Sequence, residues 1–473
     1  MNGFPYRKAH VIGIGGVGMS ATAKLLRDSG LAVTGSDEAV YPPISDVLRR
    51  EHLDYRTPYA AANIPIDADL IVIGKNAKLV RATNEEVRAA EDSGRAIMSF
   101  AQVLGHLSAN KTAVVAAGSF GKTTSVSLLA HALLESGLDP SFMIGAVPLS
   151  PPTAAHVGKG ELFLLEGDEY PSSNTDDRSK FLHYHPAHVL LTPLAHDHVN
   201  VFPTVESYLA PFTQLIGMVP EKGAVLASTS GELSGRFLAS VKRPVTTYGI
   251  AQGDWQVRDI VWGERTRFRI MRGDTAVADV ETGQLGLHNI ENMLGVGAFL
   301  VGQGYLTGEQ FARAMATFKG IKRRLDRKSD RTRIPIFEGF GSSYDKAKSA
   351  IAAMKQHFGD RRLIVVFEPH TFSWRNRGTM HWYDDVFEGA AQTFVWHPAE
   401  QGAGTHDQVT QSDIVARIAA AGHPVAAIDD KAAAVAAIGK TLGDDAAVLF
   451  LTSGNLGGLI EAVPEWAERK FPV

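Results

Sequence analysis

The segment with the clearest chemical potential is 118–124, which reads Gly-Ser-Phe-Gly-Lys-Thr-Thr. An apolar run at 112–117 precedes it and an apolar helical pattern over 125–134 follows it, so we expect the order strand, glycine turn, helix. Backbone N–H groups converge in such a turn, and the helix N-terminus adds partial positive charge. The pattern therefore predicts a site for nucleotide phosphates, formed by Gly118, Ser119, Gly121, Lys122, Thr123 and Thr124.

A second glycine-rich segment lies near the start of the chain. A strand predicted over 10–12 runs into Gly-Ile-Gly-Gly-Val-Gly at 13–18, and a helix over 19–28 and a strand over 31–35 follow. This order, with an acid after the second strand, is typical of diphosphate binding, where the acid meets a ribose hydroxyl. We assign the site to Gly13, Gly15, Gly16, Gly18 and Asp37, and both NAD and a uridine diphosphate sugar remain possible ligands.

Acidic and histidine side chains follow two further predicted strands. The apolar run 162–165 ends in Glu-Gly-Asp-Glu at 166–169, and a strand over 187–192 leads to Asp197 and His198. Because the carboxyl ends of parallel strands meet at one edge of a sheet, these groups should lie beside the phosphate loop. Such side chains are ligands for Mg²⁺ or contacts for phosphate.

The composition limits the class of protein. With 473 residues, 45% of them hydrophobic, the chain is long enough for about three domains. A formal net charge of -4 argues against a nucleic-acid or anionic-membrane partner. The absence of cysteine excludes disulfides and thiolate metal sites and fits a cytoplasmic protein. No apolar run approaches the length of about 20 residues that spans a membrane.

Strands and helices alternate along the whole chain, which predicts an α/β fold of doubly wound sheets. We expect a first domain over 1–109, a central domain over 110–324 and a last domain over 325–473. In the last domain, the expected strands are 363–367, 392–396, 424–428 and 447–451, with helices over 414–421 and 431–442.

Taken together, these segments resemble the Mur ligases, ATP-dependent amide-forming enzymes of peptidoglycan metabolism. The resemblance rests on the phosphate loop, Glu166, the pair Asp197-His198 and the sequence Gly-Leu-His-Asn-Ile-Glu-Asn at 286–292, and it covers essentially the whole chain. It implies a three-domain Mur ligase architecture: a Rossmann-like N-terminal domain for UDP-N-acetylmuramate, a central P-loop ATPase domain and a Rossmann-like C-terminal domain for the amine. The resemblance thus favours a uridine diphosphate sugar over NAD.

The resemblance also implies roles for single residues. Lys122, Glu166 and His198 would be catalytic: Lys122 would contact the ATP phosphates, Thr123 and Glu166 would hold one Mg²⁺, and His198 would hold a second. The residues that border the nucleotide would be His288, Asn289, Asn292 and Arg324.

The chain departs from the family pattern in two places. Phe120 stands where the phosphate loop usually has histidine. In the segment 338–346, Glu338 or Gly339 stands in place of the usual acid, Ser342 in place of histidine and Tyr344 in place of proline.

The reaction that the resemblance implies joins the lactyl carboxylate of UDP-N-acetylmuramate to an amine through an acyl phosphate, releasing ADP and phosphate. Segments 41–45, 166–170, 177–181 and 452–458 are similar to members that attach the peptide L-alanyl-γ-D-glutamyl-meso-diaminopimelate in peptidoglycan recycling, so we favour that amine. Segment 368–373 is similar to members that add L-alanine, which is the alternative. A nucleotide and UDP-sugar binder without turnover is an alternative of another class. We expect a monomer or weak dimer.

Overall fold

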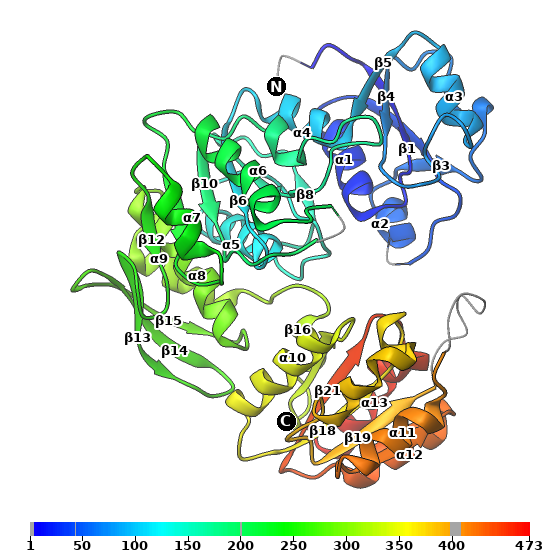
Figure 1. The fold of residues 1–473 in the computed structure, drawn as a ribbon, viewed down its shortest axis with the longest axis vertical. Coiled ribbons are helices and arrows are strands. Elements are labelled where there is room, and N and C mark those ends of the chain that lie inside the picture. The colour runs from blue at the N-terminus through cyan, green and yellow to red at the C-terminus, as the bar shows by residue number, and fades with distance from the viewer. Residues whose placement is uncertain (1–3, 43, 199–200, 398–407) are drawn as a thin grey trace. The chain divides into compact units, whose positions relative to one another are not determined.

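The structure is a computed structural model, which describes residues 4–42, 44–198, 201–397 and 408–473. The chain forms two compact units (Figure 1). The first comprises Met1–Asp259, Phe268–Val280 and Ile290–Phe318, and the second comprises Ile260–Arg267, Glu281–Asn289 and Lys319–Val473. Within the described ranges, the strands form three sheets, of five, ten and six strands. This confirms the predicted α/β class.

The first sheet has the strand order β3-β2-β1-β4-β5, with every neighbouring pair parallel. The strand order reverses between β1 and β4, and ligands of open parallel sheets bind at such a reversal, beyond the carboxyl ends of the strands. The glycine-rich turn follows β1 at this place. The elements are β1 (Lys8–Ile12), β2 (Ala32–Ser36), β3 (Asp54–Arg56), β4 (Leu70–Ile73), β5 (Ala96–Ser99), α1 (Val17–Asp28), α2 (Ile44–Arg50), α3 (Glu85–Asp92) and α4 (Phe100–Ser108).

The second sheet has the order β15-β14-β13-β12-β11-β10-β6-β9-β7-β8. Strand β6 lies between β9 and β10 and is parallel to both, so the phosphate loop after β6 is flanked by the ends of these two strands. The strands are β6 (Thr112–Ala117), β7 (Ser141–Met143), β8 (Ala155–His156), β9 (Leu162–Gly167), β10 (His188–Leu191), β11 (Val225–Ser228), β12 (Thr246–Tyr248), β13 (Trp255–Val261), β14 (Thr266–Arg272) and β15 (Thr275–Thr282). The helices are α5 (Lys122–Glu135), α6 (Val205–Met218), α7 (Ser234–Ser240), α8 (Leu287–Gly302) and α9 (Gly308–Thr317).

The third sheet has the order β16-β17-β21-β18-β19-β20, with β16 antiparallel to β17 and the other pairs parallel. All strands predicted for this part of the chain are present, with ends displaced by one residue at most. The elements are β16 (Arg324–Arg327), β17 (Ile336–Phe340), β18 (Arg362–Phe367), β19 (Gln392–Trp396), β20 (Val425–Ile428), β21 (Ala446–Thr452), α10 (Tyr344–His357), α11 (Gln411–Ala420), α12 (Lys431–Thr441) and α13 (Leu459–Lys470).

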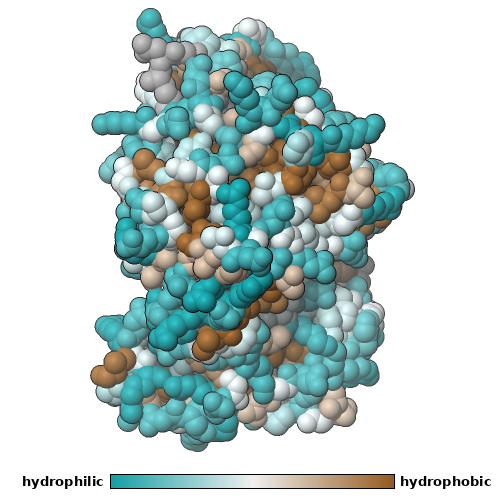
Figure 2. Space-filling model, turned by 90° about the vertical axis from the view of Figure 1, so that its left-hand side faces the viewer, coloured by the Kyte–Doolittle hydropathy of each residue, from teal (hydrophilic) through white to brown (hydrophobic). Residues whose placement is uncertain are grey.

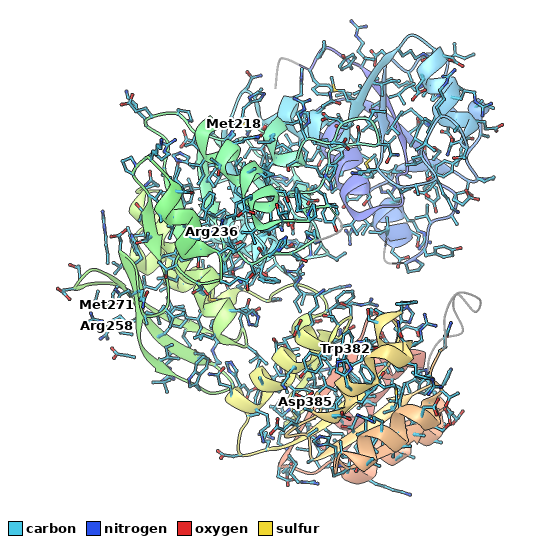
Figure 3. All side chains as sticks on the ribbon, viewed as in Figure 1. Met218, Arg236, Arg258, Met271, Trp382 and Asp385 are labelled. Atoms are coloured by element: carbon cyan, nitrogen blue, oxygen red, sulfur yellow. The ribbon has the colours of Figure 1, made fainter. Side chains whose placement is uncertain are left out.

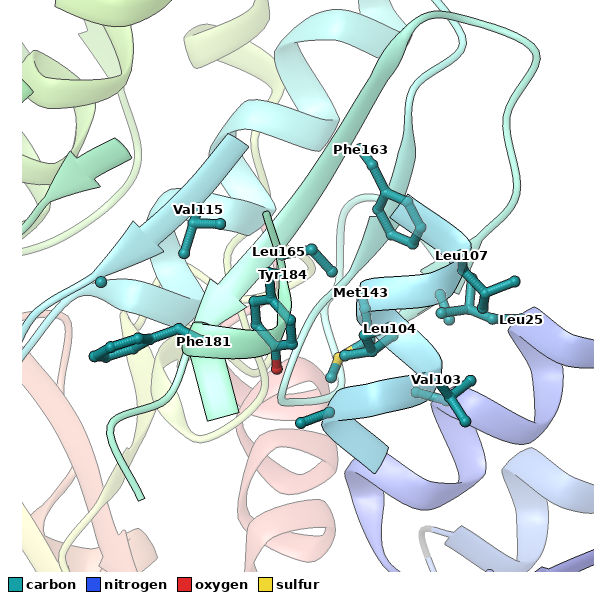
Figure 4. Packing of buried hydrophobic residues seen from close by; sticks show 14 of the residues in the cluster. Leu25, Val103, Leu104, Leu107, Val115, Met143, Phe163, Leu165, Phe181 and Tyr184 are labelled. Carbon is teal, nitrogen blue, oxygen red and sulfur yellow. The ribbon is translucent and has the colours of Figure 1, made fainter. Parts of the chain in front are cut away.

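One hydrophobic core joins the first two sheets within the first unit. Figure 4 shows Leu25 of α1 and Leu104 of α4 in the same cluster as Met143 of β7 and Phe163 of β9. Helix α4 also packs closely against the short 3-10 helix Lys180–His183, which follows β9, because a side chain at Gly105 would collide with the carbonyl of His183. The predicted boundary near residue 109 therefore lies between two sheets that share one hydrophobic core.

The face seen in Figure 2 is mostly hydrophilic, with hydrophobic patches between the hydrophilic residues. In the part of the chain that the structure describes, no helix is both long enough and apolar enough to cross a membrane.

A buried carboxylate ties α3 to the first sheet. The Glu86 side chain is fully buried, and its Oε1 lies 2.8 Å from His10 Nε2 and accepts the Ser36 hydroxyl at 2.6 Å. Its Oε2 accepts the Ala60 N–H at 2.9 Å and the Asn63 side-chain amide at 3.1 Å. Burial alone would raise the pKa of Glu86, but the hydrogen bonds, chiefly from His10 and Ser36, outweigh burial and hold that pKa below its ordinary value.

We expect Glu86→Gln to lower the free energy of unfolding by about 2 kcal/mol at neutral pH, because it removes a charged acceptor from four donors. Since the folded state lowers the pKa of Glu86, this contribution is present above the unfolded value of about 4.3 and is lost as the pH falls through the lower folded value. Urea unfolding at several pH values measures it. The exposed neighbour Glu85, changed to Gln, is the control. A stability difference that stays constant into acid would contradict this assignment.

Candidate active site

The phosphate loop between β6 and α5 is held in shape from two sides. Gly121 has a φ of +87°, and a side chain there would collide with the amide of Asn292 on α8, so glycine is required. Ser119 donates its N–H to the carbonyl of Pro193 at 2.9 Å and its hydroxyl to the carbonyl of Ala195 at 2.8 Å. The loop is therefore fastened to the chain after β10.

Lys122 lies at the centre of a cluster of charged and polar side chains. Its Nζ donates to the carbonyl of Gly118 at 2.6 Å and to Glu169 Oε2 at 2.9 Å. The carboxylate of Glu169 is fully buried, and its Oε1 lies 3.3 Å from His198 Nε2. Burial raises the pKa of Glu169, and Lys122 offsets only part of that effect. The ammonium is thus held beside the turn in which phosphates are expected.

A second pair lies at the first residues of α5. The Thr123 hydroxyl donates to Glu166 Oε1 at 2.7 Å, and the Gly145 N–H donates to Glu166 Oε2 at 2.9 Å. Two members of the predicted metal set, Thr123 and Glu166, are therefore in contact. The third, His198, is paired with Glu169, which the sequence assignment left out although the acidic run 166–169 contains it.

The ring of His198 is held by its neighbours. Tyr170 Oη lies 2.9 Å from His198 Nδ1, and the two ring centroids are 4.4 Å apart. Nε2 is then directed to Glu169. This arrangement fixes the imidazole at the end of the loop that follows β10.

The donor set suits a hard divalent cation that is shared with a nucleotide. Over the described ranges, no group of three acidic or histidine side chains could hold a metal ion by itself. Mg²⁺ usually takes one or two carboxylates from the protein and completes its shell with water and phosphate oxygens. The pairs Thr123 with Glu166, and Glu169 with His198, fit that requirement; the metal roles themselves stay predictions.

The remaining predicted nucleotide contacts fall in different units. Asn292 packs against Gly121 in the first unit. His288, Asn289 and Arg324 belong to the second unit, where the Asn289 amide donates to the carbonyl of Leu285 at 2.9 Å. Burial, together with the charge of Arg324, lowers the pKa of His288. Contact of these three residues with a nucleotide stays a prediction.

The first-sheet edge brings together the predicted diphosphate residues. The N–H of Gly15 donates to Asp37 Oδ2 at 2.7 Å, and the Tyr59 hydroxyl donates to Asp37 Oδ1 at 3.0 Å. Gly16 is the N-cap of α1, and Gly18 lies against the ring of Phe100. Asp37 therefore stabilises the glycine turn. Its contact with a ribose stays a prediction.

In the second unit, side chains of the segment 338–346, which departs from the family pattern, form structural contacts. Glu338 is buried and accepts Lys328 Nζ at 2.8 Å. A side chain at Gly339 would meet the apolar surfaces of Leu451 and Ala350, so an acid there would be buried against hydrocarbon. The Tyr344 hydroxyl donates to Asp385, which Figure 3 labels. These residues are built into the fold of the last sheet.

Comparison with known proteins matches two stretches to family models: residues 8–112 to the Mur ligase family, catalytic domain, and residues 116–300 to the Mur ligase middle domain. A UDP-N-acetylmuramate–L-alanine ligase of Acidithiobacillus ferrooxidans is 30% identical over 468 residues, which cover 97% of each chain. The solved UDP-N-acetylmuramate-alanine ligase of Thermotoga maritima has a TM-score of 0.77 at 20% identity and covers 98% of this chain and 99% of its own.

A further solved structure is the UDP-N-acetylmuramate:L-alanyl-gamma-D-glutamyl-meso-diaminopimelate ligase from Neisseria meningitides. It is 29% identical, with a TM-score of 0.61, and the match covers 67% of this chain and 100% of that chain. The likenesses together confirm the predicted three-domain fold.

We expect Glu169→Gln and Glu166→Gln each to lower kcat by about two orders of magnitude or more and to raise the Mg²⁺ concentration needed for half-maximal rate, because each removes a charged oxygen ligand. Phosphate release measured against Mg²⁺ concentration tests this. Glu161→Gln, an exposed position one residue before β9, is the matched control. Unchanged Mg²⁺ dependence in both site variants would exclude these carboxylates as ligands.

Proposed function

The chain belongs to the Mur ligase family, and on that premise we propose that it joins the lactyl carboxylate of UDP-N-acetylmuramate to the amino group of L-alanine. ATP-dependent joining of a carboxylate to an amine is the activity of the family. The observation that supports an ATP-dependent step is the cluster of Lys122, Glu169 and His198 beside the glycine turn at 118–121. The curated relatives are named for L-alanine, so this alternative now stands ahead of the peptide that the sequence favoured.

The chemistry must activate a carboxylate, which does not react with an amine in water. Transfer of the γ-phosphoryl group from ATP to a carboxylate oxygen gives an acyl phosphate. The amine then attacks the carbonyl carbon, loses a proton, and the carbon–oxygen bond to phosphate breaks. Both steps gather negative charge, so fixed positive groups are the main source of catalysis.

The chain supplies those groups from β6, β9 and β10. Lys122 and the N–H groups of the loop offset charge on the transferring phosphoryl group. When bound, Mg²⁺ would neutralise phosphate oxygens and would be held by Thr123 and Glu166 and by Glu169 and His198. No side chain needs to act as a nucleophile. The glycine turn after β1 holds the UDP group, so that the attached carboxylate is presented to ATP.

A peptide is the second candidate amine, and two observations favour it. The first is the Neisseria structure, which is named for ligation of L-alanyl-gamma-D-glutamyl-meso-diaminopimelate and is 29% identical to this chain. The second is the similarity of the segments 166–170, 177–181 and 452–458 to peptide-adding members.

Competition between L-alanine and the tripeptide at equal concentration tests the amine. With UDP-N-acetylmuramate, ATP and Mg²⁺, we expect UDP-N-acetylmuramoyl-L-alanine as the main product in mass spectrometry of the UDP compounds. A product that carries only the tripeptide would establish the second candidate. Failure of both amines to give product or phosphate would favour a binder without turnover.

We expect Lys122→Ala to abolish ATP-dependent phosphate release while binding of UDP-N-acetylmuramate changes by no more than about twofold, since the two glycine turns belong to different sheets. Calorimetry of the variant measures the binding. Lys159→Ala, which removes an exposed cation elsewhere on the central sheet, should leave both properties unchanged. Loss of UDP-sugar binding in Lys122→Ala would show that the first-sheet site is wrongly assigned.

A further inference from the structure

A loop of the central sheet closes on itself beside the catalytic cluster. We call residues 168–181, which follow β9, the bridging loop. At its base, Lys180 Nζ donates to Asp168 Oδ2 at 2.6 Å, and the Lys180 N–H donates to the carbonyl of Tyr170 at 3.0 Å. Pro171 and Ser179 pair as an antiparallel bridge. The loop therefore has a defined shape and can transmit a displacement from one end to the other.

The outer part of the bridging loop holds the segment 75–79, which follows β4 of the first sheet. The side-chain amide of Asn174 donates to the carbonyl of Asn76 at 2.9 Å and to that of Leu79 at 2.7 Å. Lys75 Nζ donates to the carbonyl of Pro171 at 3.2 Å. An amide group has two N–H bonds to donate, and Asn174 uses both on one turn of the other sheet.

The held segment lies directly against the glycine turn of the UDP-sugar site. Gly74 donates its N–H to the carbonyl of Ile12, so the ends of β4 and β1 lie side by side. Leu79 is buried, and its Cδ1 would lie only 2.9 Å from a Cβ atom at Gly13. A displacement of Leu79 would therefore change the space and the backbone position of the turn.

The inner end of the bridging loop reaches the phosphate site. Its second residue, Glu169, binds Lys122 and lies beside His198, and its third residue, Tyr170, holds the other nitrogen of His198. One loop thus touches the groups that meet ATP and, through Asn174, the segment that packs on the UDP-sugar turn.

We propose that Asn174 is a positioning residue that couples the two nucleotide sites: a ligand on either side stabilises the same arrangement of the bridging loop. The inference rests on the proposed function only for the identity of the ligand at Gly13. Coupling of this kind is reciprocal, because each ligand must raise the affinity for the other by the same factor.

The test measures the coupling factor, which is the ratio of the affinities for UDP-N-acetylmuramate with and without a saturating non-hydrolysable ATP analogue and Mg²⁺. We expect a factor of about five or more in the native protein. In Asn174→Ala the factor should fall to near one, while the affinity for each ligand alone changes by no more than about twofold. Thr175→Ala is the matched control, since its hydroxyl contacts Ser173 of the same loop. A variant that keeps the native factor, or a native protein that has none, overturns the proposal.

Amide hydrogen exchange provides a second test of the coupling, which does not need the sugar nucleotide. The ATP analogue with Mg²⁺ should slow exchange at residues 13–18 and 76–80 in the native protein and in Thr175→Ala, and should have no effect there in Asn174→Ala. Equal slowing in Asn174→Ala contradicts the coupling. If UDP-N-acetylmuramate does not bind the native protein, the proposed function fails, and the exchange result still decides the role of Asn174.

Discussion

The site depends on the pairing of a buried carboxylate with the lysine of the phosphate loop. Glu169 is fully buried, and a buried carboxylate without a partner costs several kcal/mol. Lys122 provides that partner while it also donates to the carbonyl of Gly118, so its ammonium is held beside the loop. In the proposed mechanism, a nucleotide would attract Lys122 to its phosphates, and Glu169 would then need another cation. A divalent ion held by Glu169 and His198 would supply it, so one carboxylate would link metal binding to nucleotide binding.

This pairing requires that three strands end at one place. Strand β6 carries the loop, β9 leads to Glu169, and the chain after β10 supplies His198 and the carbonyls that fasten Ser119. The parallel register between these strands determines how far along the strand direction each of the side chains at their ends lies. The core that β9 shares with α1 and α4 then sets the first sheet beside this edge. The positions of the charged groups therefore follow from ordinary packing of apolar side chains below them.

The features that the sequence predicts well are those that depend on residues close together in the chain. The phosphate loop and the glycine turn at 13–18 have fixed spacings because the turn geometry itself needs them. Strands of buried apolar residues, such as β18 and β21, were expected within a residue or so of their observed ends. The strands β13 to β15 were not predicted, although β14 alternates buried and more exposed side chains from Thr266 to Ile270, as a strand should. The alternation breaks at Arg258 and Asp259 in β13 and at Met271 in β14; Figure 3 labels Arg258 and Met271.

Other features depend on contacts between distant residues. Glu166 and Glu169 are both acids after an apolar run, and only the fold reveals that one faces Thr123 and the other Lys122. Asn174 and Leu79 are 95 residues apart in the chain, so no local sequence pattern predicts their hydrogen bond. Glu338 stands near the place of the usual family acid in the sequence, and its burial beside Lys328 is visible only in the third sheet.

In the proposed reaction, a carboxylate oxygen attacks the γ-phosphorus of ATP and later leaves with the phosphate. The direct measurement uses UDP-N-acetylmuramate labelled with oxygen-18 at both oxygens of the lactyl carboxylate, with ATP, Mg²⁺ and L-alanine, followed by mass spectrometry of the released phosphate. We expect each phosphate formed to carry a single oxygen-18 atom from the carboxylate. Unlabelled phosphate alongside labelled amide product, or release of pyrophosphate in place of phosphate, would contradict it.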